Sequence, residues 1–327
     1  MRSLTTAEAR ALCFILATGP SREIDRIRAS GLPRRTYQSI RRRAMEAEWI
    51  EDRFVPDCPR FGWPHASFVI VRPFLEELDA CRDRWVNDPT TVLLWATPEV
   101  LFRVSFTTKP FKLRGKYRDS FLLTVDCRAP GVSTFFDFER SFSRWTRQDG
   151  GWSPPDPLPG SGRKAVTLRP RSSSRREFTE VRKLLARLEA PTTAEAGSTS
   201  FNSREARELV SSGAVKHRVF LNVSNFPRFG GQSIQRLTLA HGRLLPAERP
   251  DGLYYVLAQV TKVSPFLFIS DDRDVLLGVV SSGERPLARG PVLDTLRKFL
   301  TSIEVTRLET DSLDAPVSHR YSRLFEG

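Results

Sequence analysis

Three short stretches near the start of the chain place apolar residues at helical spacing: residues 5–18, 21–30 and 33–47. In the third stretch, the positions that share one side of the predicted helix are Tyr37, Ile40, Ala44 and Met45. A strand-like segment, Trp49–Val55, follows and is bounded by prolines and Gly62. This pattern predicts three helices followed by a β-wing.

Residues that favour helix ends and turns separate the three stretches. Thr5–Glu8 has the form of a capping box, and Gly19-Pro20 ends the first predicted helix. Ser21 suits the start of the second helix, because its hydroxyl can accept a hydrogen bond from a free amide. Gly31 suits a left-handed residue at the end of that helix, and Pro33 suits the first turn of the next. The order of elements is that of a helix-turn-helix.

The third predicted helix is rich in arginine. Between Arg22 and Arg43 there are eight arginines against two acids, Glu23 and Asp25, which leaves a local charge of +6. Arginine binds guanine through two hydrogen bonds, and glutamine binds adenine in the same way. The outward positions therefore match the chemistry of DNA: Arg34, Arg35, Gln38, Arg41 and Arg42. A solvated basic helix in an ordinary small bundle is the alternative.

Residues 23–52 resemble the winged helix-turn-helix of the Lrp/AsnC (feast/famine) transcription regulators. The positions that carry the resemblance are Glu23-Ile24, Gly31-Leu32, Thr36, Arg41 and Trp49-Ile50. Glu48 departs from the pattern, since the family usually has a glycine before the last apolar pair. The resemblance implies that the third helix lies in the DNA major groove. The residues expected to contact DNA are Arg22, Arg34, Arg35, Tyr37, Gln38, Arg41, Arg42 and Arg53.

The next part of the chain, residues 63–146, is predicted to follow the order β-α-β-β-α-β. Its apolar pattern predicts a helix at 74–86 and strands at 65–75, 91–96, 100–107, 121–126 and 132–138. The basic stretch 110–121 fits no single element. The order approximates a ferredoxin-like fold. In the Lrp/AsnC family this fold is that of the effector (RAM) domain.

The second half of the chain repeats this organisation. The sequence Pro59-Arg60-Phe61-Gly62 recurs at residues 227–230. Beyond it, the pattern predicts helices at 253–261 and 290–301 and strands at 234–245, 265–270, 275–281 and 302–309. The counterpart of the recognition helix, Ser203–Ser212, has two arginines against two glutamates and lacks a basic face. The predicted fold is therefore α+β, with a winged helix-turn-helix, a ferredoxin-like (RAM-like) unit and a degenerate second copy of both.

Linkers rich in glycine, proline and serine complete the predicted domain organisation. The predicted segments are a winged helix-turn-helix domain at 1–62, a ferredoxin-like domain at 63–146, a linker at 147–173, a degenerate winged-helix-like segment at 174–230, a second ferredoxin-like domain at 231–310 and a C-terminal tail at 311–327.

Composition narrows the functional classes. The net charge of +13 favours a polyanionic partner. The four cysteines include no Cys-x-x-Cys pair, no Cys/His cluster has zinc spacing, and no nucleotide-binding or hydrolase motif is present. No apolar run reaches the roughly 18–20 residues that span a bilayer, and the start of the chain lacks the order of a signal peptide. We therefore expect a cytoplasmic protein that is not an enzyme and that uses no metal or cofactor.

The leading hypothesis is a sequence-specific regulator that binds double-stranded DNA as a homodimer, with a small amino-acid-like effector implied by the family resemblance. One alternative is an RNA-binding, single-stranded-DNA-binding or chromosome-associated basic protein, which would expose aromatic rings on a sheet. Its candidate rings are Phe135, Phe136, Phe138, Phe142 and Trp145. Another alternative is a ligand-sensing assembly module that does not bind DNA.

Overall fold

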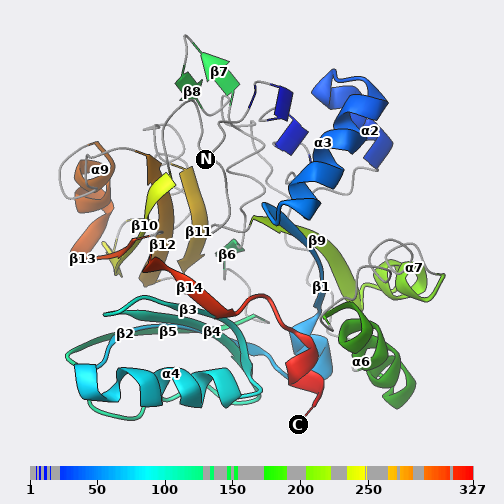
Figure 1. Ribbon diagram of the computed structural model, residues 1–327. Coiled ribbons are helices and arrows are strands. Elements are labelled where there is room, and N and C mark those ends of the chain that lie inside the picture. Colours follow the sequence, from blue (N-terminus) through cyan, green and yellow to red (C-terminus); the bar gives the residue numbers. More distant parts are fainter. Residues whose placement is uncertain are drawn as a thin grey trace. The chain divides into compact units, whose positions relative to one another are not determined.

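In the computed structural model the chain forms two compact units. Figure 1 shows their helices and strands. Unit 1 comprises Met1–Glu51, Gly131–Lys164 and Val219–Ser312, and unit 2 comprises Asp52–Pro130, Ala165–Arg218 and Leu313–Gly327. The described residues are 23–127, 133–135, 146–148, 151–153, 173–189, 204–221, 234–246, 264–270, 273–282, 291–309 and 312–326, with Thr5, Ala7, Glu8, Ala11, Leu12, Ile15 and Glu248.

The predicted helix pair is present in unit 1. Helix α2 spans Glu23–Ser30 and helix α3 spans Arg34–Glu46. Between them Gly31 has φ 64°, the left-handed conformation that its position predicts. The hydroxyl of Ser30 donates to the carbonyl of Ile27 at 2.7 Å and accepts from the amide of Leu32 at 3.2 Å, which fixes the turn.

The capping box near the start of the chain is also present. The amide of Glu8 donates to Thr5 Oγ1 at 3.2 Å, and the amide of Thr5 donates to the Glu8 carboxylate at 2.8 Å. After α3, Glu48 has φ 53°, a conformation that favours glycine. This explains physically why a glycine is usual at the position where the sequence departs from the Lrp/AsnC pattern.

The first sheet belongs to unit 2 and has five antiparallel strands in the order β14-β3-β4-β2-β5. Its strands are β2 (His65–Arg72), β3 (Thr91–Ala96), β4 (Leu101–Thr107), β5 (Asp119–Asp126) and β14 (Asp314–Val317). Helix α4 (Leu78–Asn87), preceded by the 3-10 turn Leu75–Glu77, connects β2 to β3 and covers one face. Between β4 and β5, where the ferredoxin-like order predicts a second helix, residues 108–118 form a loop.

The second sheet belongs to unit 1 and has the order β13-β10-β12-β11-β6. Its strands are β6 (Ser133–Phe135), β10 (Ile234–Leu244), β11 (Ser264–Ser270), β12 (Asp274–Ser282) and β13 (Leu300–Glu309). Helix α9 (Pro291–Phe299) connects β12 to β13. The predicted helix at 253–261 lies outside the described residues.

Each sheet takes its fifth strand from the other half of the sequence. Strand β6 follows the first sheet along the chain but pairs with β11 of the second. Strand β14 follows the second sheet but pairs with β3 of the first. In both sheets the added strand lies beside the second strand of the β-α-β-β series.

The remaining elements of unit 2 surround residues 57–63. They are the 3-10 helix η1 (Cys58–Phe61), α6 (Arg175–Glu189), α7 (Arg204–Ser211), and the C-terminal 3-10 helix η4 (Ser322–Phe325). Strands β1 (Ile50–Pro56) and β9 (Val215–Leu221) form a two-stranded sheet. In unit 1, the short strands β7 (Thr146–Gln148) and β8 (Gly151–Ser153) form another. Phe61, Trp63, Phe178 and Phe325 pack together with ring centroids 4.8–6.2 Å apart.

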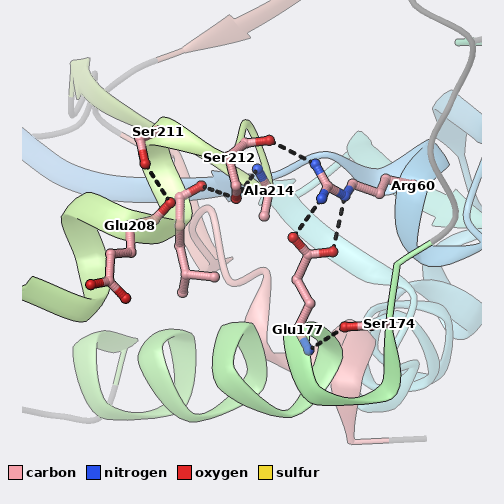
Figure 2. Close-up of polar contacts among 8 residues, drawn as sticks. Arg60, Ser174, Glu177, Glu208, Ser211, Ser212 and Ala214 are labelled. Atoms are coloured by element: carbon pink, nitrogen blue, oxygen red, sulfur yellow. Dashed lines mark hydrogen bonds and ion pairs between the residues drawn. The ribbon is translucent and has the colours of Figure 1, made fainter.

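Arg60 joins α6 to the end of α7 (Figure 2). Its guanidinium donates to both oxygens of Glu177, at 2.5 and 3.1 Å, and to the carbonyl of Ser212 at 2.8 Å. The amide of Glu177 in turn donates to Ser174 Oγ at 3.1 Å, which is half of a capping box. The carboxylate that would complete the box binds Arg60 instead, because a bidentate arginine pair is the stronger interaction.

The mixture of helices and antiparallel sheets confirms the predicted α+β class. The strands predicted at 91–96, 100–107 and 121–126 are present with small changes at their ends. The C-terminal segment, predicted only as a tail, instead contains β14 and η4.

Candidate functional site

The two faces of the first sheet differ in chemistry. Strand register places Phe68, Phe102 and Val104 on one face, all of them buried and apolar. The other face is apolar only in part. There Val69 and Leu94 pack against Trp85 of α4, and polar side chains occupy the rest of that face.

The polar residues form two rows at one end of the sheet, which we call the polar end. The inner row crosses four strands in register: Thr91, Ser105, Ser67 and Thr124. The outer row crosses three: Thr107, His65 and Asp126. Side chains directly opposite each other in an antiparallel sheet share a face and lie close together. The polar end therefore brings hydroxyls, an imidazole and a carboxylate to one surface of the sheet.

Next to the inner row, a buried arginine lies on the same face. Arg103 is 1% exposed, and its Nη2 donates to Asp88 at 2.5 Å and to Thr90 Oγ1 at 2.9 Å. Two aromatic rings, Trp85 and Phe111, lie 5.4 and 4.9 Å from its guanidinium carbon. These contacts offset the removal of the cation from water, both through the ion pair and through cation–π attraction.

The Arg103–Asp88 pair stays ionised despite its burial. Burial raises the pKa of Asp88, but Arg103 and the hydrogen bonds from Thr90 outweigh it, so the pKa of Asp88 lies below its usual value. Burial lowers the pKa of Arg103, against the opposing effect of Asp88. A guanidinium remains protonated near neutral pH even after such a shift.

Three buried polar atoms at this position have no hydrogen-bond partner among the described residues. They are Arg103 Nε, Thr91 Oγ1 and Ser105 Oγ. By contrast, Ser67 Oγ and Thr124 Oγ1 in the same row bind each other at 2.9 Å. Buried polar groups nearly always have a partner, so the unpartnered atoms suit a water molecule or a ligand oxygen.

A second arginine reaches this position from the C-terminal segment. Arg323 of η4 donates to the carbonyl of Val86 and, at 3.4 Å, to that of Thr91. Its charge acts on that of Arg103, and Asp88 acts on both. Glu326 and Arg320 also act on Arg323, so the guanidinium groups at this position, three in number, exceed the two carboxylates by one. We call these residues the Arg103 cluster: Asp88, Thr90, Thr91, Arg103, Ser105 and Arg323.

The C-terminal segment is held at this place by a buried carboxylate. Glu189, at the end of α6, accepts hydrogen bonds from the amides of Tyr321 and Ser322 at 3.0 and 2.9 Å and from Ser322 Oγ at 2.7 Å. A carboxylate at the start of a helical turn satisfies its free amides. Glu189 therefore positions the helix η4 that supplies Arg323.

The residues predicted to contact DNA have different placements. Arg34, Arg35, Gln38 and Arg42 are exposed on α3, and Arg41 is half-buried. Tyr37 is 1% exposed and is part of the core, so its side chain is not available to DNA. Arg53 is half-buried in β1, and Arg22 lies outside the described residues, as do the aromatic residues at 136–145.

The Arg103 cluster was not predicted from the sequence. Its signal is a single arginine in the strand Leu101–Phe106, which is apolar apart from Arg103 and Ser105, because a charge is expected in such a strand only if it is paired. Among the described residues, no group of three or more His, Cys, Asp or Glu side chains is placed to hold a metal ion. Nor does any helix in the described part of the chain have the length and apolar character needed to cross a membrane.

Comparison with known proteins finds similarity only at the level of structure. No known protein family matches the sequence, and no curated protein matches it significantly. Two solved structures are similar to the chain: the siroheme decarboxylase NirDL, with a TM-score of 0.49, and the same enzyme in complex with an iron-uroporphyrin III analogue, with a TM-score of 0.48. Each is 9% identical to this chain, and each match covers 98% of this chain and 97% of the other. At this similarity neither the substrate nor the reaction of NirDL follows for this chain.

These matches contradict the function predicted from the sequence. Both structures are of an enzyme, and one holds a tetrapyrrole analogue, whereas the sequence pattern predicts a transcription regulator that binds double-stranded DNA and is not an enzyme. The alternatives, an RNA- or single-stranded-DNA-binding protein, a chromosome-associated protein and a ligand-sensing module, do not match either. The resemblance to Lrp/AsnC regulators remains one of general fold.

The physical reason for the error lies in α3. An arginine-rich outer face is equally typical of a solvated helix, and this helix neutralises part of its own charge. Arg42 lies 3.7 Å from Glu46, four residues along, and Arg43 lies 3.1 Å from the buried Glu8. The residues that favour helix ends and turns predicted the helices correctly, but they do not indicate which ligand the chain binds.

Proposed function

We propose that the chain is an enzyme that binds a carboxylate-bearing small molecule at the Arg103 cluster. The observation that carries the proposal is the convergence of three unpartnered buried atoms, Arg103 Nε, Thr91 Oγ1 and Ser105 Oγ, beside two arginines. A carboxylate oxygen accepts hydrogen bonds from all three kinds of donor. Ligand sites typically combine aromatic walls with a few such convergent polar groups, and Trp85 and Phe111 supply the walls.

His65 is the residue that we assign to proton transfer. It lies in the outer row, two residues along β2 from Ser67, or about 7 Å at the usual rise of a strand. Tyr117 and Cys81, which pack against this face, are less suitable, because burial raises the pKa of Tyr117 to about 12 and raises that of Cys81 above its usual value. Histidine is the side chain that ordinarily gains and loses a proton near neutral pH. Asp126 lies opposite His65 on β5.

We also infer that the chain is a duplicated winged-helix and ferredoxin-like protein, with the domain boundaries predicted from the sequence except at β6 and β14, which pair with the sheet of the other half. The recurring Pro-Arg-Phe-Gly sequence supports this organisation, and so does the common strand order of the two sheets. The reciprocal placement of β6 and β14 supports it further, since two copies of one unit would each donate the same strand.

The test of the binding site is a ligand titration of the full chain. Thermal unfolding and calorimetry are measured with acetate, succinate, inorganic phosphate and iron-uroporphyrin, the last because an analogue of it is held by one of the similar structures. A ligand of the folded state raises stability in proportion to the logarithm of its concentration. We expect at least one carboxylate to stabilise the protein.

Two serines of the inner row give a matched pair of variants. Ser105→Ala removes an unpartnered hydroxyl, so we expect the unliganded protein to gain about 1 kcal/mol while ligand affinity falls about tenfold. Ser67→Ala removes a hydroxyl already bound to Thr124, so it lowers stability by about 1 kcal/mol and leaves affinity unchanged. Equal ligand affinity in wild type and Ser105→Ala would overturn the proposed site.

His65→Gln tests the assignment of proton transfer. This variant is expected to bind the ligand as the wild type does but not to convert it, and mass spectrometry follows the conversion.

A further inference from the structure

A separate feature of unit 2 is the loop between β4 and β5, residues 108–118, which we call the cationic loop. It carries five cations and no acidic residue: Lys109, Lys112, Arg114, Lys116 and Arg118. All five side chains are exposed. Within the described part of the chain, none of them forms an ion pair, and the adjacent Asp119 lies 3.9 Å from Arg72.

The backbone of the cationic loop is fixed to the sheet. Phe111, Leu113 and Tyr117 pack against the core between the sheet and α4. Thr107 Oγ1 donates to the carbonyl of Lys109 at 2.6 Å, and the amide of Arg118 donates to the carbonyl of Arg72 at 2.8 Å. The loop therefore holds its cations on an ordered frame, which lowers the entropy lost when a partner binds.

One glycine is needed for this shape. Gly115 has φ 120°, a conformation that other residues rarely adopt. A Cβ at this position would lie 3.1 Å from the hydroxyl oxygen of Tyr117, whose ring folds over the glycine and whose hydroxyl donates to the carbonyl of Arg114 at 2.8 Å. The apolar and aromatic side chains of the loop are thus directed inward while its cations are exposed.

We propose that the cationic loop is a docking surface for an acidic, extended polypeptide segment of a partner protein. Charge complementarity argues for an acidic partner, because five adjacent cations have no acid among them. Four of them stand at every second residue, from Lys112 to Arg118, and an extended peptide with alternating acids presents carboxylates on one side at the same interval. The five cations of this surface are not part of the carboxylate site proposed above, although Phe111 of the same loop lies against Arg103.

The surroundings of the loop argue against other polyanions. Single-stranded nucleic acids need aromatic side chains on which bases stack, and those of the loop are packed against the core. A bilayer surface needs exposed apolar anchors. Among the described residues from 53 to 127, the large apolar side chains that are exposed are Phe74 and Leu75, which are too few to anchor the chain in a bilayer.

The experiment measures binding of a fluorescent peptide of alternating glutamate and alanine, about twelve residues long to match an extended segment of this size. The charge-reversal variant is Lys112→Glu with Lys116→Glu. Its matched control is Lys183→Glu with Lys298→Glu, which changes net charge equally at exposed lysines elsewhere. We expect the affinity of the loop variant to fall at least tenfold at low salt, and that of the control to change less than about threefold.

Three outcomes would overturn the proposal. The first is an equal loss of affinity in both variants, which would show attraction to the net charge of the chain alone. The second is tighter binding of single-stranded RNA, or of vesicles with anionic lipid, than of the acidic peptide. The third is wild-type binding no stronger to this peptide than to one in which glutamine replaces each glutamate. None of these measurements depends on a carboxylate at the Arg103 cluster, so the two proposals fail separately.

Discussion

The two five-stranded sheets share one strand order but differ in what connects the third strand to the fourth. In the second sheet this connection contains helix α9, and in the first it contains the cationic loop. The cause is visible in the sequence: Pro110 and Gly115 interrupt residues 108–118, whereas Pro291 stands at the first position of α9, where proline is tolerated. The first sheet therefore has a loop where the second has a helix, and this loop covers charged and polar groups of the first sheet.

The side-chain contacts of Arg103 in the first sheet and of His241 in the second differ as well. In the first sheet Arg103 is almost fully buried and Asp88 is 30% exposed. In the second, His241 lies 3.5 Å from Glu304 on the neighbouring strand, and the Glu304 side chain is 61% exposed. Burial of an ion pair has a large desolvation cost, so natural sequences keep such pairs where an additional role offsets it. The buried pair of the first sheet is therefore the one for which an additional role is expected.

The largest effect is expected from breaking the buried pair. Asp88→Asn leaves the buried Arg103 charge without its carboxylate, so we expect the free energy of unfolding to fall by about 3 kcal/mol. The matched change in the second sheet, Glu304→Gln, removes an exposed carboxylate and is expected to change stability by less than about 1 kcal/mol. Urea unfolding of both variants gives the two values.

Similar losses in the two variants would mean that the sheets do not differ in the way their burial indicates. A large loss for Glu304→Gln alone would reverse the comparison and place the critical pair in the second sheet.

An intermediate effect is expected at Glu189, which holds the start of helix η4. Glu189→Gln weakens three hydrogen bonds to the start of η4, so we expect a loss of about 2 kcal/mol and faster proteolysis near residue 320. Glu180→Gln on the same helix is the control, since Glu180 pairs with an exposed arginine and contributes little. If proteolysis near residue 320 is as slow in Glu189→Gln as in the wild type, the Glu189 carboxylate does not hold the C-terminal segment in place.

The last effect is absent at neutral pH and concerns stability in acid. His319 is buried in the C-terminal segment beside the first sheet, and burial, together with Arg53, lowers its pKa from 6.5 to about 3. The unfolded chain therefore binds a proton below pH 6.5 that the folded chain does not bind until about pH 3. Stability is fully present above pH 6.5 and falls by up to roughly 1.4 kcal/mol per pH unit between these values.

His319→Asn tests this dependence, because asparagine tolerates the left-handed φ of 47° found here. We expect its plot of stability against pH to be flatter than that of the wild type below pH 6.5. His217→Asn, at an exposed position, is expected to keep the wild-type slope. If stability falls with pH equally steeply in the wild type and in His319→Asn, a group other than His319 causes the loss of stability in acid.

Local patterns in the sequence predicted much of the fold. The left-handed residue at Gly31, the capping box at Thr5–Glu8 and the strand Thr91–Ala96 all follow from short-range chemistry. The pairing of β14 with β3 did not, because no local pattern specifies a partner more than two hundred residues away. Long-range pairing depends on the whole folded chain.

The candidate site was less predictable, for a related reason. Charge density along the sequence directed attention to α3, where the charges are adjacent and exposed. The Arg103 cluster instead gathers single polar residues from β3, β4, a loop and the C-terminal helix η4. Only the strand register shows that Thr91, Ser105 and Ser67 form one row.

The pairing of β14 with β3 has a consequence for synthesis of the protein on the ribosome. Strand β3 ends at Ala96, but its partner begins at Asp314. At a usual rate of translation the outer edge of β3 waits roughly ten to forty seconds for that partner. An unpaired strand edge is a site for association with other chains. Nascent chains of this protein therefore pass through a period in which this edge is open to association with other chains, and codons that slow translation before residue 314 lengthen it.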